Sequence, residues 1–386
     1  MKPIKHLLFI ILSLMFVLTS CSDHKTSLSG LEYAKFDTTI NTKPVKLYTL
    51  KNASKTMEVC VTNYGARIVS VLVPNKFGSM TDVVLGFDNI HQYADTVNTP
   101  NNFGAAIGRY ANRIAKAQFT LEGEKIQLPK NNNGHCLHGG PAGWHCQVFD
   151  VVEATDNSIK LSLTSPDGDM NFPGEVVATV TYTVTDDNVL DMLFEATTDK
   201  TTIVNMTNHS YFNLSGDPSV PCTDHVLYVN ADYYTPIDST FIPTGEIKNV
   251  YGTPMNFNKR HPLYQTIGDT SWQDIRFAGG YDHNWCLNSY KDGKGNDQIL
   301  SASLYSPNSG IQMDLYTNEP GLQIYTGNFL DGKMQGKRGI SYPKQASICL
   351  ETQKFPDSPN KKDFPSPVLK PGEKYQSHAA YKFSVN

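Results

Sequence analysis

The sequence of 386 residues has few charged residues and no concentrated basic segment. Asp, Glu, Lys and Arg make up 18% of the chain, and 37 acidic residues outnumber 33 basic ones. Proteins that bind nucleic acid place clustered lysines and arginines against the phosphates. The composition therefore predicts no nucleic-acid partner.

The chain also lacks the short motifs that mark several classes of enzyme. It has no glycine-rich phosphate loop, no dinucleotide-binding fingerprint and no nucleophile elbow. It has neither HExxH nor CxxC, and the histidines and cysteines of "HCLHGGPAGWHC" (residues 135–146) match no recurrent zinc spacing. "DGDMN" (residues 167–171) begins like a calcium loop but lacks the following glycine and the distant glutamate, so a turn is the better interpretation. We expect no metal in the site.

The one long apolar run lies at the N-terminus. Residues 7–18, "LLFIILSLMFVL", follow Lys2 and Lys5 and are too few to span a membrane, which is typical of a signal peptide. "LTSC", which ends at Cys21, resembles the lipobox of bacterial lipoproteins, in which the cysteine becomes the lipidated first residue. We expect a signal peptide over residues 1–20, a polar tether over residues 21–35 and a lipid anchor on Cys21. The protein would then be a periplasmic or surface-facing lipoprotein of a bacterial cell envelope; an ordinary cleaved signal is the alternative.

Six cysteines follow Cys21, in a compartment that permits disulfides. Cys60 and Cys349 lie in strand-like runs and are predicted to be small apolar core residues. A bridge between Cys136 and Cys146 is left open.

A two-residue alternation of apolar and polar side chains runs through the chain. "SIKLSL" (residues 158–163) and "EVVATVTYTV" (residues 175–184) show it, and the pattern resumes at Leu190 after the turn "TDDN". This period predicts β-strands with one buried face, and the turn predicts a hairpin. The only helix candidate is "RYANRIAKA" (residues 109–117). We therefore expect an all-β protein.

No repeat, linker or shift in composition divides the rest of the chain. We expect a single domain over residues 36–386, a large antiparallel β-sandwich that acts as a monomer. The proline-rich segment of residues 354–375 is predicted to be a long loop, either functional or packed against the domain.

Three of the predicted strands carry polar side chains on one face. The residues that share these faces are His209 and Tyr211, Gln323 and Tyr325, and Glu351 and Gln353. An ionisable glutamate in an otherwise apolar strand is costly to bury without partners. We therefore expect the three faces to meet in a shared pocket.

Other polar residues lie in segments rich in glycine or aromatic side chains. "LHGG" presents His138 on a glycine turn that lets a ligand approach closely. "GRYANRIAKA" carries Arg109 and Arg113, and "GGYDHNW" carries Asp282 and His283. Such a mixture suits a sugar, whose hydroxyls need donors and acceptors and whose apolar face needs an aromatic ring. Surface ion pairs are the alternative for these charged residues.

Seven motifs resemble those of the aldose 1-epimerase (galactose mutarotase) family, in the family's order and over nearly all of residues 36–386. They are "GRYANRI", "LHGG", "SPDGDMNFPG", "TNHSYFNLSG", "GGYDHN", "PGLQIYTGN" and "LETQKFPDSPN". Small departures, at Asn171, Trp285 and Cys286, concern the sugar preference more than the chemistry.

The resemblance implies the antiparallel β-sandwich called the supersandwich, and interconversion of the α and β anomers of aldohexoses such as glucose and galactose. It implies that Glu351 is the general base and His209 the general acid. It further implies that the sugar is held by Asn112, Arg113, His138, Tyr211, Asp282 and Gln323. This chemistry requires no cofactor, and a structural Ca²⁺ ion is left open.

The proton transfers set the expected charge state of the pair. Reference pKa values are about 4.3 for glutamate and about 6.5 for histidine, so we expect Glu351 ionised and His209 protonated, with Asp282 favouring the imidazolium. The base would take the anomeric proton while the acid protonates the ring oxygen, which opens the ring. The alternatives are a non-catalytic carbohydrate-binding protein and a glycoside hydrolase that uses Asp282 and Glu351 as its two carboxylates.

Overall fold

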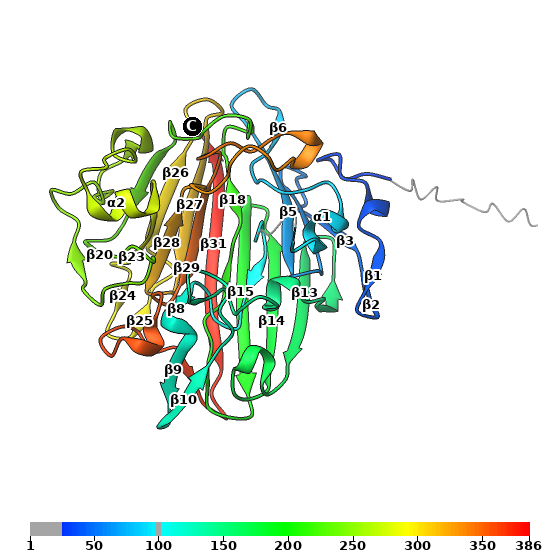
Figure 1. The fold of residues 1–386 in the computed structure, drawn as a ribbon. Helices are drawn as coiled ribbons and strands as arrows, with labels where there is room; N and C mark the ends of the chain where they lie inside the picture. The colour runs from blue at the N-terminus through cyan, green and yellow to red at the C-terminus, as the bar shows by residue number, and fades with distance from the viewer. Residues whose placement is uncertain (1–24, 98–101) are drawn as a thin grey trace, which may run out of the picture.

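The computed structural model describes residues 25–97 and 102–386 (Figure 1). The expected signal peptide and Cys21 lie outside these residues. Within the described part, no helix is both long and apolar enough to cross a membrane.

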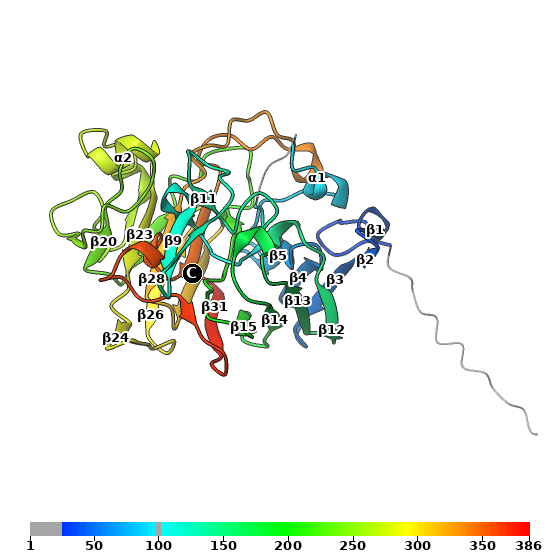
Figure 2. The ribbon, with the colours of Figure 1, turned by 60° about the horizontal axis from the view of Figure 1, so that its bottom comes forward.

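One layer of the fold is a nine-stranded antiparallel sheet (Figures 1 and 2). Its strands, in spatial order, are β12 (Asp150–Ala154), β13 (Ser158–Ser165), β14 (Val176–Val184), β15 (Val189–Thr198), β31 (Tyr375–Val385), β27 (Ile311–Thr317), β26 (Leu300–Tyr305), β19 (Val226–Val229) and β22 (His261–Pro262). β14 and β15 form the predicted hairpin, with Val184 opposite Leu190. Alternate residues of β14 are buried, which confirms the two-residue period.

The second layer consists of two smaller antiparallel sheets. The six-stranded sheet contains, in spatial order, β18 (Tyr211–Phe212), β29 (Ile348–Gln353), β28 (Gly321–Tyr325), β23 (Asp282–Cys286), β20 (Tyr233–Thr235) and β21 (Lys248–Asn249). The four-stranded sheet contains β3 (Leu47–Lys51), β4 (Glu58–Thr62), β5 (Arg67–Pro74) and β6 (Met80–Asp82).

Short elements complete the described part of the chain. The two-stranded pairs are β1 (Thr38–Ile40) with β2 (Lys43–Val45), β7 (Ala106–Ile107) with β17 (Thr207–Asn208), β8 (Arg113–Ile114) with β11 (Cys136–Leu137), β9 (Gln118–Leu121) with β10 (Glu124–Gln127), β16 (Thr202–Ile203) with β30 (Val368–Leu369), and β24 (Tyr290–Lys291) with β25 (Lys294–Gly295). The helices are α1 (Ile90–Ala94) and α2 (Gln273–Ala278), with 3₁₀ turns at Tyr33–Lys35, Ala115–Ala117, Trp144–Cys146, Asp169–Asn171, Leu263–Gln265, Lys337–Gly339 and Ser358–Asn360. Both α-helices are too short to show a helical period in the sequence.

Apolar side chains of both layers meet in one core. Leu161 and Phe194 of the nine-stranded sheet belong to the same buried cluster as Leu350 of the six-stranded sheet and Ile68 of the four-stranded sheet. The hydroxyl of Tyr381 also donates a hydrogen bond across the layers to the carbonyl oxygen of Leu350, at 2.6 Å. The fold is the expected antiparallel β-sandwich.

One expectation from the sequence is wrong, and one possibility that was left open is decided by the structure. Residues 109–117 form no α-helix, because Arg113–Ile114 pair as strand β8 with β11, and Asn112 and Lys116 adopt left-handed backbone angles. Tertiary pairing here overrides the local propensity for helix. The cysteines of the described residues are free, so the bridge between Cys136 and Cys146 does not form.

Two segments expected to be irregular pack against the sandwich. Leu31 is buried, and the backbone N–H of Leu28 donates to Glu58 at 2.8 Å, so this part of the expected tether lies on the fold. In the proline-rich segment, Asp357 accepts a hydrogen bond from the N–H of Ala115. The hydroxyl of Tyr110 donates to the carbonyl oxygen of Phe355.

His378 of β31 forms a charged link on the nine-stranded sheet. Its Nε2 lies 2.8 Å from Asp191 of β15, and its Nδ1 lies 2.7 Å from Asp297. The hydrogen bond to Asp191 is the main reason that the pKa of His378 is raised above its usual value, and Asp297 adds to it. The link is therefore strongest when His378 carries a proton.

We expect His378→Gln to lower the free energy of unfolding by about 1 kcal/mol at pH 6 and by clearly less at pH 9. A raised folded-state pKa means that the stabilisation is complete below the unfolded-state pKa and is lost as the pH rises through the folded-state value. Urea unfolding at the two pH values measures the difference. Equal destabilisation at both would contradict an ionic role.

Candidate active site

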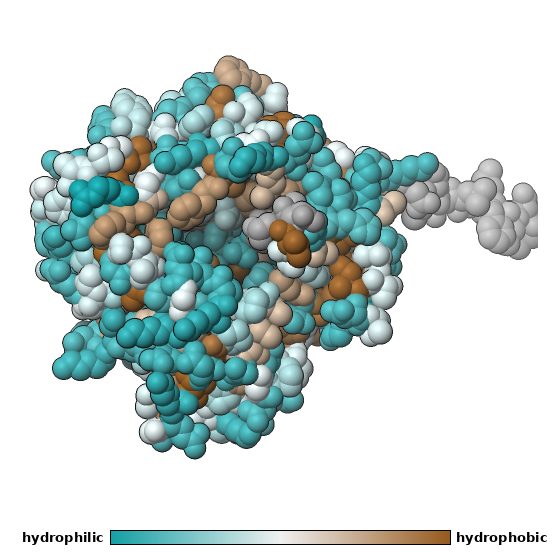
Figure 3. Space-filling model, viewed as in Figure 1, coloured by the Kyte–Doolittle hydropathy of each residue, from teal (hydrophilic) through white to brown (hydrophobic). Residues whose placement is uncertain are grey.

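A cavity of about 230 Å³ opens on the face of the six-stranded sheet that is turned away from the core. Figure 3 shows a hollow with a largely polar floor near the middle of this side of the molecule. Seven of the eight residues predicted for the site line the cavity: Asn112, Arg113, His138, His209, Tyr211, Asp282 and Glu351. The eighth, Gln323, lies behind Asp282 and donates a hydrogen bond to its Oδ1 at 2.7 Å.

The alternation of side chains along β29 and β23 places the carboxylates of Glu351 and Asp282 in this cavity. Leu350 of β29 belongs to the core, so its neighbour Glu351 points to the opposite face. On β28, Gln323 lies opposite Glu351. On β23, Asn284 lies opposite Gln323, and Asp282, two residues earlier on the strand, shares its face. The polar face predicted for these strands is therefore the floor of the site.

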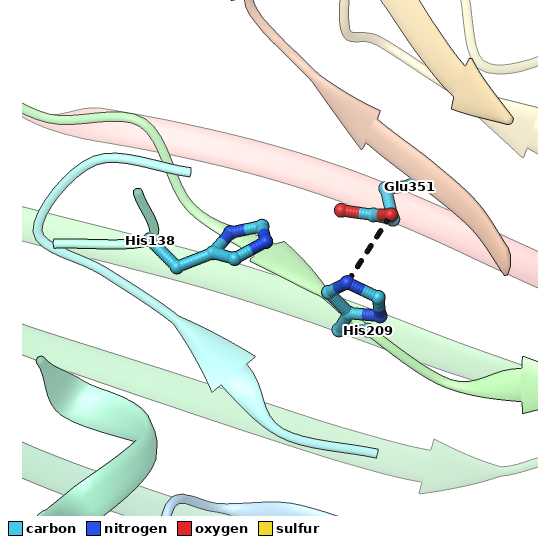
Figure 4. A group of neighbouring side chains, drawn as sticks. All are labelled: His138, His209 and Glu351. Carbon is cyan, nitrogen blue, oxygen red and sulfur yellow. Dashed lines mark ion pairs between the residues drawn. The ribbon is translucent and has the colours of Figure 1, made fainter. Parts of the chain in front are cut away.

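His209 and Glu351 face each other inside the cavity. The Nε2 atom of His209 lies 3.5 Å from Oε1 of Glu351, and both side chains are almost fully buried. Figure 4 shows the imidazole of His209 directed at the carboxylate, with His138 approaching from the other side. A carboxylate and an imidazole at this separation form an acid–base pair.

His209 lies between two short strands rather than within one long strand. Its backbone N–H donates to the carbonyl oxygen of Ala105, and its own carbonyl accepts from Gly104, each at 2.9 Å. The ring of Tyr211 stacks on the ring of His209, with centroids 4.9 Å apart and 14° between the planes. These contacts hold the imidazole in place, and His209 and Tyr211 share the cavity side as predicted.

Asn112, Arg113 and His138 reach the cavity from the pair β8–β11. The backbone N–H of Asn112 donates to Nδ1 of His138 at 3.2 Å. Asn112 and His138 both have positive φ, a strained conformation that recurs at functional sites. Gly139 is required because a Cβ there would lie 2.2 Å from the carbonyl oxygen of Gly108. The glycine thus admits neighbouring backbone rather than a ligand, which corrects the reason inferred from the sequence.

Asp282 and Arg113 form a second charged pair in the site. Nη1 of Arg113 lies 3.7 Å from Oδ2 of Asp282, and both side chains are nearly buried. Nε of Arg113 also donates to Asn132 at 3.1 Å. Asp282 therefore has two partners, Arg113 and Gln323, whereas Glu351 faces His209.

Burial changes the charge state that the sequence predicted. Loss of water raises the pKa of Glu351 well above its usual value; the charge of Asp282 adds to the rise, and Arg113 opposes it. Burial also lowers the pKa of His209 to about 3, with a further contribution from Arg67. In the empty cavity these shifts favour the neutral forms of both groups, which is opposite in direction to the charge state expected from the sequence. When the pair holds a single proton, both shifts favour the carboxyl group over the imidazole as its place.

His138, His209 and Glu351 form the one group in the described residues with metal-like geometry, since their ligand atoms lie within 4.8 Å of one another. Nδ1 of His138 accepts a hydrogen bond from the backbone, so its Nε2 carries the proton. A protonated Nε2 can donate to a ligand oxygen but has no free lone pair for a metal. The donor set suits a polar organic ligand better than a metal ion.

Arg109, which the sequence analysis noted, lies outside the site. Arg109 is buried and donates to the carbonyl oxygens of Ser165, Pro166, Pro173 and Gly174, so it holds the loop that contains "DGDMN". Conversely, the sequence did not single out Leu137 of β11 or the loop residues Asn102, Phe103, Asn132, Phe329, Leu330 and Met334, which also line the cavity. Phe329 is 62% exposed, and no strand period marks residues of this kind.

Comparison with known proteins agrees with the fold and the site. The family model described as aldose 1-epimerase matches residues 46–382. The chain is 42% identical over 332 residues to galactose mutarotase of Mus musculus, an alignment that covers 86% of this chain and 92% of the relative. It is 38% identical over 345 residues to aldose 1-epimerase of Escherichia coli (strain K12), which covers 88% and 96%. The solved structure of an aldose epimerase homologue from C. elegans matches with a TM-score of 0.80 and 29% identity, over 88% of this chain and 99% of that one.

A β-sandwich with a polar cavity and an acid–base pair, matched along its length by epimerases, defines an isomerase. The chain belongs to the aldose 1-epimerase family, enzymes that interconvert the anomers of aldoses. The family resemblance drawn from the seven motifs is thereby confirmed.

We expect kcat/KM for anomer interconversion to form a broad plateau in pH, because the reactive pair must hold one proton. The rate should rise as the doubly protonated pair loses its first proton, below pH 4.5, because the pKa of His209 is lowered. It should fall only well above the usual titration range of a glutamate, because burial raises the pKa of Glu351. Polarimetry from pH 3 to 10, corrected for the spontaneous reaction, measures both limbs, which belong to the pair as a whole. A narrow optimum between pH 4.5 and 6.5 would show that burial does not control the pair.

Proposed function

We propose that Glu351 is the general base and His209 the general acid of this epimerase, acting on aldohexoses such as glucose and galactose. The observation that carries the proposal is the 3.5 Å separation of the carboxylate and the imidazole inside a polar cavity. Both proton transfers use side chains of the chain itself, so no metal or redox cofactor is required.

The proposed reaction opens and recloses the sugar ring. Glu351 takes the proton from the anomeric hydroxyl, the O1–H electrons form the C1=O1 double bond, and the C1–O5 bond breaks. His209 gives its proton to O5, which leaves an open-chain aldehyde. Rotation about C1–C2 presents the other face of the carbonyl, and the reverse steps restore both proton carriers and give the other anomer. Positioned acid and base groups each contribute about 10² to 10⁴ in rate.

The sugar must convert the resting pair into its reactive form. Burial in the empty cavity favours the shared proton on Glu351, and its transfer to His209 creates the base and the acid together. Arg113 favours the ionised carboxylate. Sugar hydroxyls that donate hydrogen bonds to Glu351 favour it further. Binding and activation are then coupled.

The remaining residues are proposed to hold the hydroxyls. Asp282 accepts hydrogen bonds, with Gln323 fixing its orientation. Arg113 and the side-chain amide of Asn112 donate, and His138 donates through Nε2. Tyr211 positions His209 by stacking.

Glu351→Gln should lower kcat by about 10² to 10⁴ while sugar affinity changes by less than about tenfold. The amide keeps the shape and the hydrogen-bonding capacity of the carboxylate but removes its basicity. Polarimetry of fresh α-D-glucose and α-D-galactose measures the rate, and ligand-observed NMR measures binding.

Glu319→Gln is the matched control, since Glu319 is equally buried but pairs with Lys354 away from the cavity. It should keep its activity per folded molecule. Full activity in Glu351→Gln would overturn the assignment of the base. Sugar binding without faster anomer exchange in the unaltered protein would favour a binding protein instead.

We also propose that Cys21 carries a lipid anchor that holds the protein in a bacterial cell envelope. The support is the sequence of residues 1–21 alone. Cys21→Ser should release the protein into the soluble fraction or leave its signal peptide attached, as detergent partitioning and mass spectrometry would reveal. An unmodified Cys21 within a mature soluble chain would refute the anchor.

A further inference from the structure

A second cavity of about 420 Å³ adjoins the proposed sugar pocket. Asn102, Asn132, Leu137 and His138 line both cavities. The two spaces therefore share a wall, and a substituent that leaves the sugar pocket beside His138 enters the second cavity.

Arg67 contributes an uncompensated positive charge to this cavity. It begins β5 and is 1% exposed. Its Nη1 donates to the carbonyl oxygen of Phe103 at 3.0 Å, and its Nη2 donates to that of His145 at 2.7 Å. Nε has no hydrogen-bond partner in the described residues. Three of the five guanidinium N–H groups are thus unused.

Other buried cations of the described chain lie close to carboxylates. Lys337 pairs with Asp82, and Arg113 pairs with Asp282. Arg109 makes five hydrogen bonds and lies within the field of Asp169. Arg67 forms no ion pair within the described residues and contacts the rings of Tyr64 and Tyr93 instead. An isolated buried charge is costly, and an anionic ligand would offset that cost.

The proposed chemistry orients the sugar toward this cavity. With O1 at Glu351 and O5 at His209, the ring continues from O5 to C5, which carries C6. Glu351 lines only the first cavity, whereas His138 lines both, and its ring lies 5.1 Å from the ring of His209. A group on C6 that extends past His138 enters the second cavity, which Arg67 also lines.

We propose that the second cavity binds an acidic group carried at C6 of the aldose, a carboxylate or a phosphate ester, with Arg67 as its main ligand. Nδ1 of His145, which is buried without a partner in the described residues, is available as a further contact. The inference rests on the proposed function, because the orientation follows from the roles of Glu351 and His209.

The test compares D-glucose, D-glucuronate and D-glucose 6-phosphate as substrates of the unaltered protein and of Arg67→Met. Exchange NMR of the anomeric protons measures kcat/KM for each sugar. At least one acidic sugar should match or exceed glucose with the unaltered protein. Arg67→Met should lower kcat/KM for that sugar by about 10- to 100-fold more than for glucose, the worth of a hydrogen bond to a charged group; any change in the pKa of His209 affects all the sugars and cancels in this ratio.

Arg338→Met is the control, because Arg338 is exposed and lines neither cavity. It changes the net charge equally and should leave the ratio between acidic and neutral sugars unaltered. A preference for glucuronate alone indicates a carboxylate site, and one for glucose 6-phosphate alone a phosphate site. The inference would be overturned if the unaltered protein acted on glucose but kcat/KM for both acidic sugars were more than 100-fold lower. It would also be overturned if Arg67→Met lowered kcat/KM equally for all the sugars.

A binding measurement covers the case in which Arg67→Met does not fold. Methyl glycosides cannot open their ring, so they bind without reacting. If the site takes a carboxylate, methyl α-D-glucuronide should bind the unaltered protein more tightly than methyl α-D-glucoside. If the site takes a phosphate, methyl α-D-glucoside 6-phosphate should bind more tightly than methyl α-D-glucoside. Weaker binding of both acidic glycosides would refute the acidic-group site. No acceleration with glucose or galactose would instead refute the proposed function.

Discussion

Each strand of the six-stranded sheet serves two environments at once, because successive side chains point to opposite faces. Leu350 packs in the core of the sandwich, and Glu351 therefore lies in the cavity; Leu322 and Gln323 repeat the arrangement on the next strand. A slip of one residue in register would send the carboxylate into the core. The position of the reactive group thus depends on the packing of its apolar neighbour.

Burial also determines how the site can react. A cavity with little water disfavours isolated charges, so burial raises the pKa of Glu351 and lowers that of His209. Asp282, by contrast, pairs with Arg113 and accepts a hydrogen bond from Gln323. The same exclusion of water strengthens every hydrogen bond that a sugar forms inside the cavity. The exclusion of water thus explains both the preference for neutral groups in the empty site and the strength of hydrogen bonds in the filled site.

The positive charge of Arg67 acts on titratable groups in both cavities. Its charge contributes to the lowered pKa of both His145 and His209, although it belongs to the four-stranded sheet and His209 lies between β17 and β18. An anion beside Arg67 would therefore also alter the proton affinity of the acid–base pair. Occupation of the second cavity and chemistry in the first are not independent.

The sequence by itself determined the strands, the hairpin of β14 and β15, and the shared polar face of His209 and Tyr211, because these features follow from a two-residue period between neighbours in the chain. Seven local motifs also identified the family and seven of the residues that line the cavity. Only the tertiary structure decided that Arg113–Ile114 pair as a strand, that Cys136 and Cys146 stay free, and that burial raises the pKa of Glu351. It alone placed Arg67 in the cavity that His138 also lines. Those outcomes depend on contacts between residues far apart in the chain and on burial. Neither these contacts nor the burial can be inferred from the residues that are neighbours in the sequence.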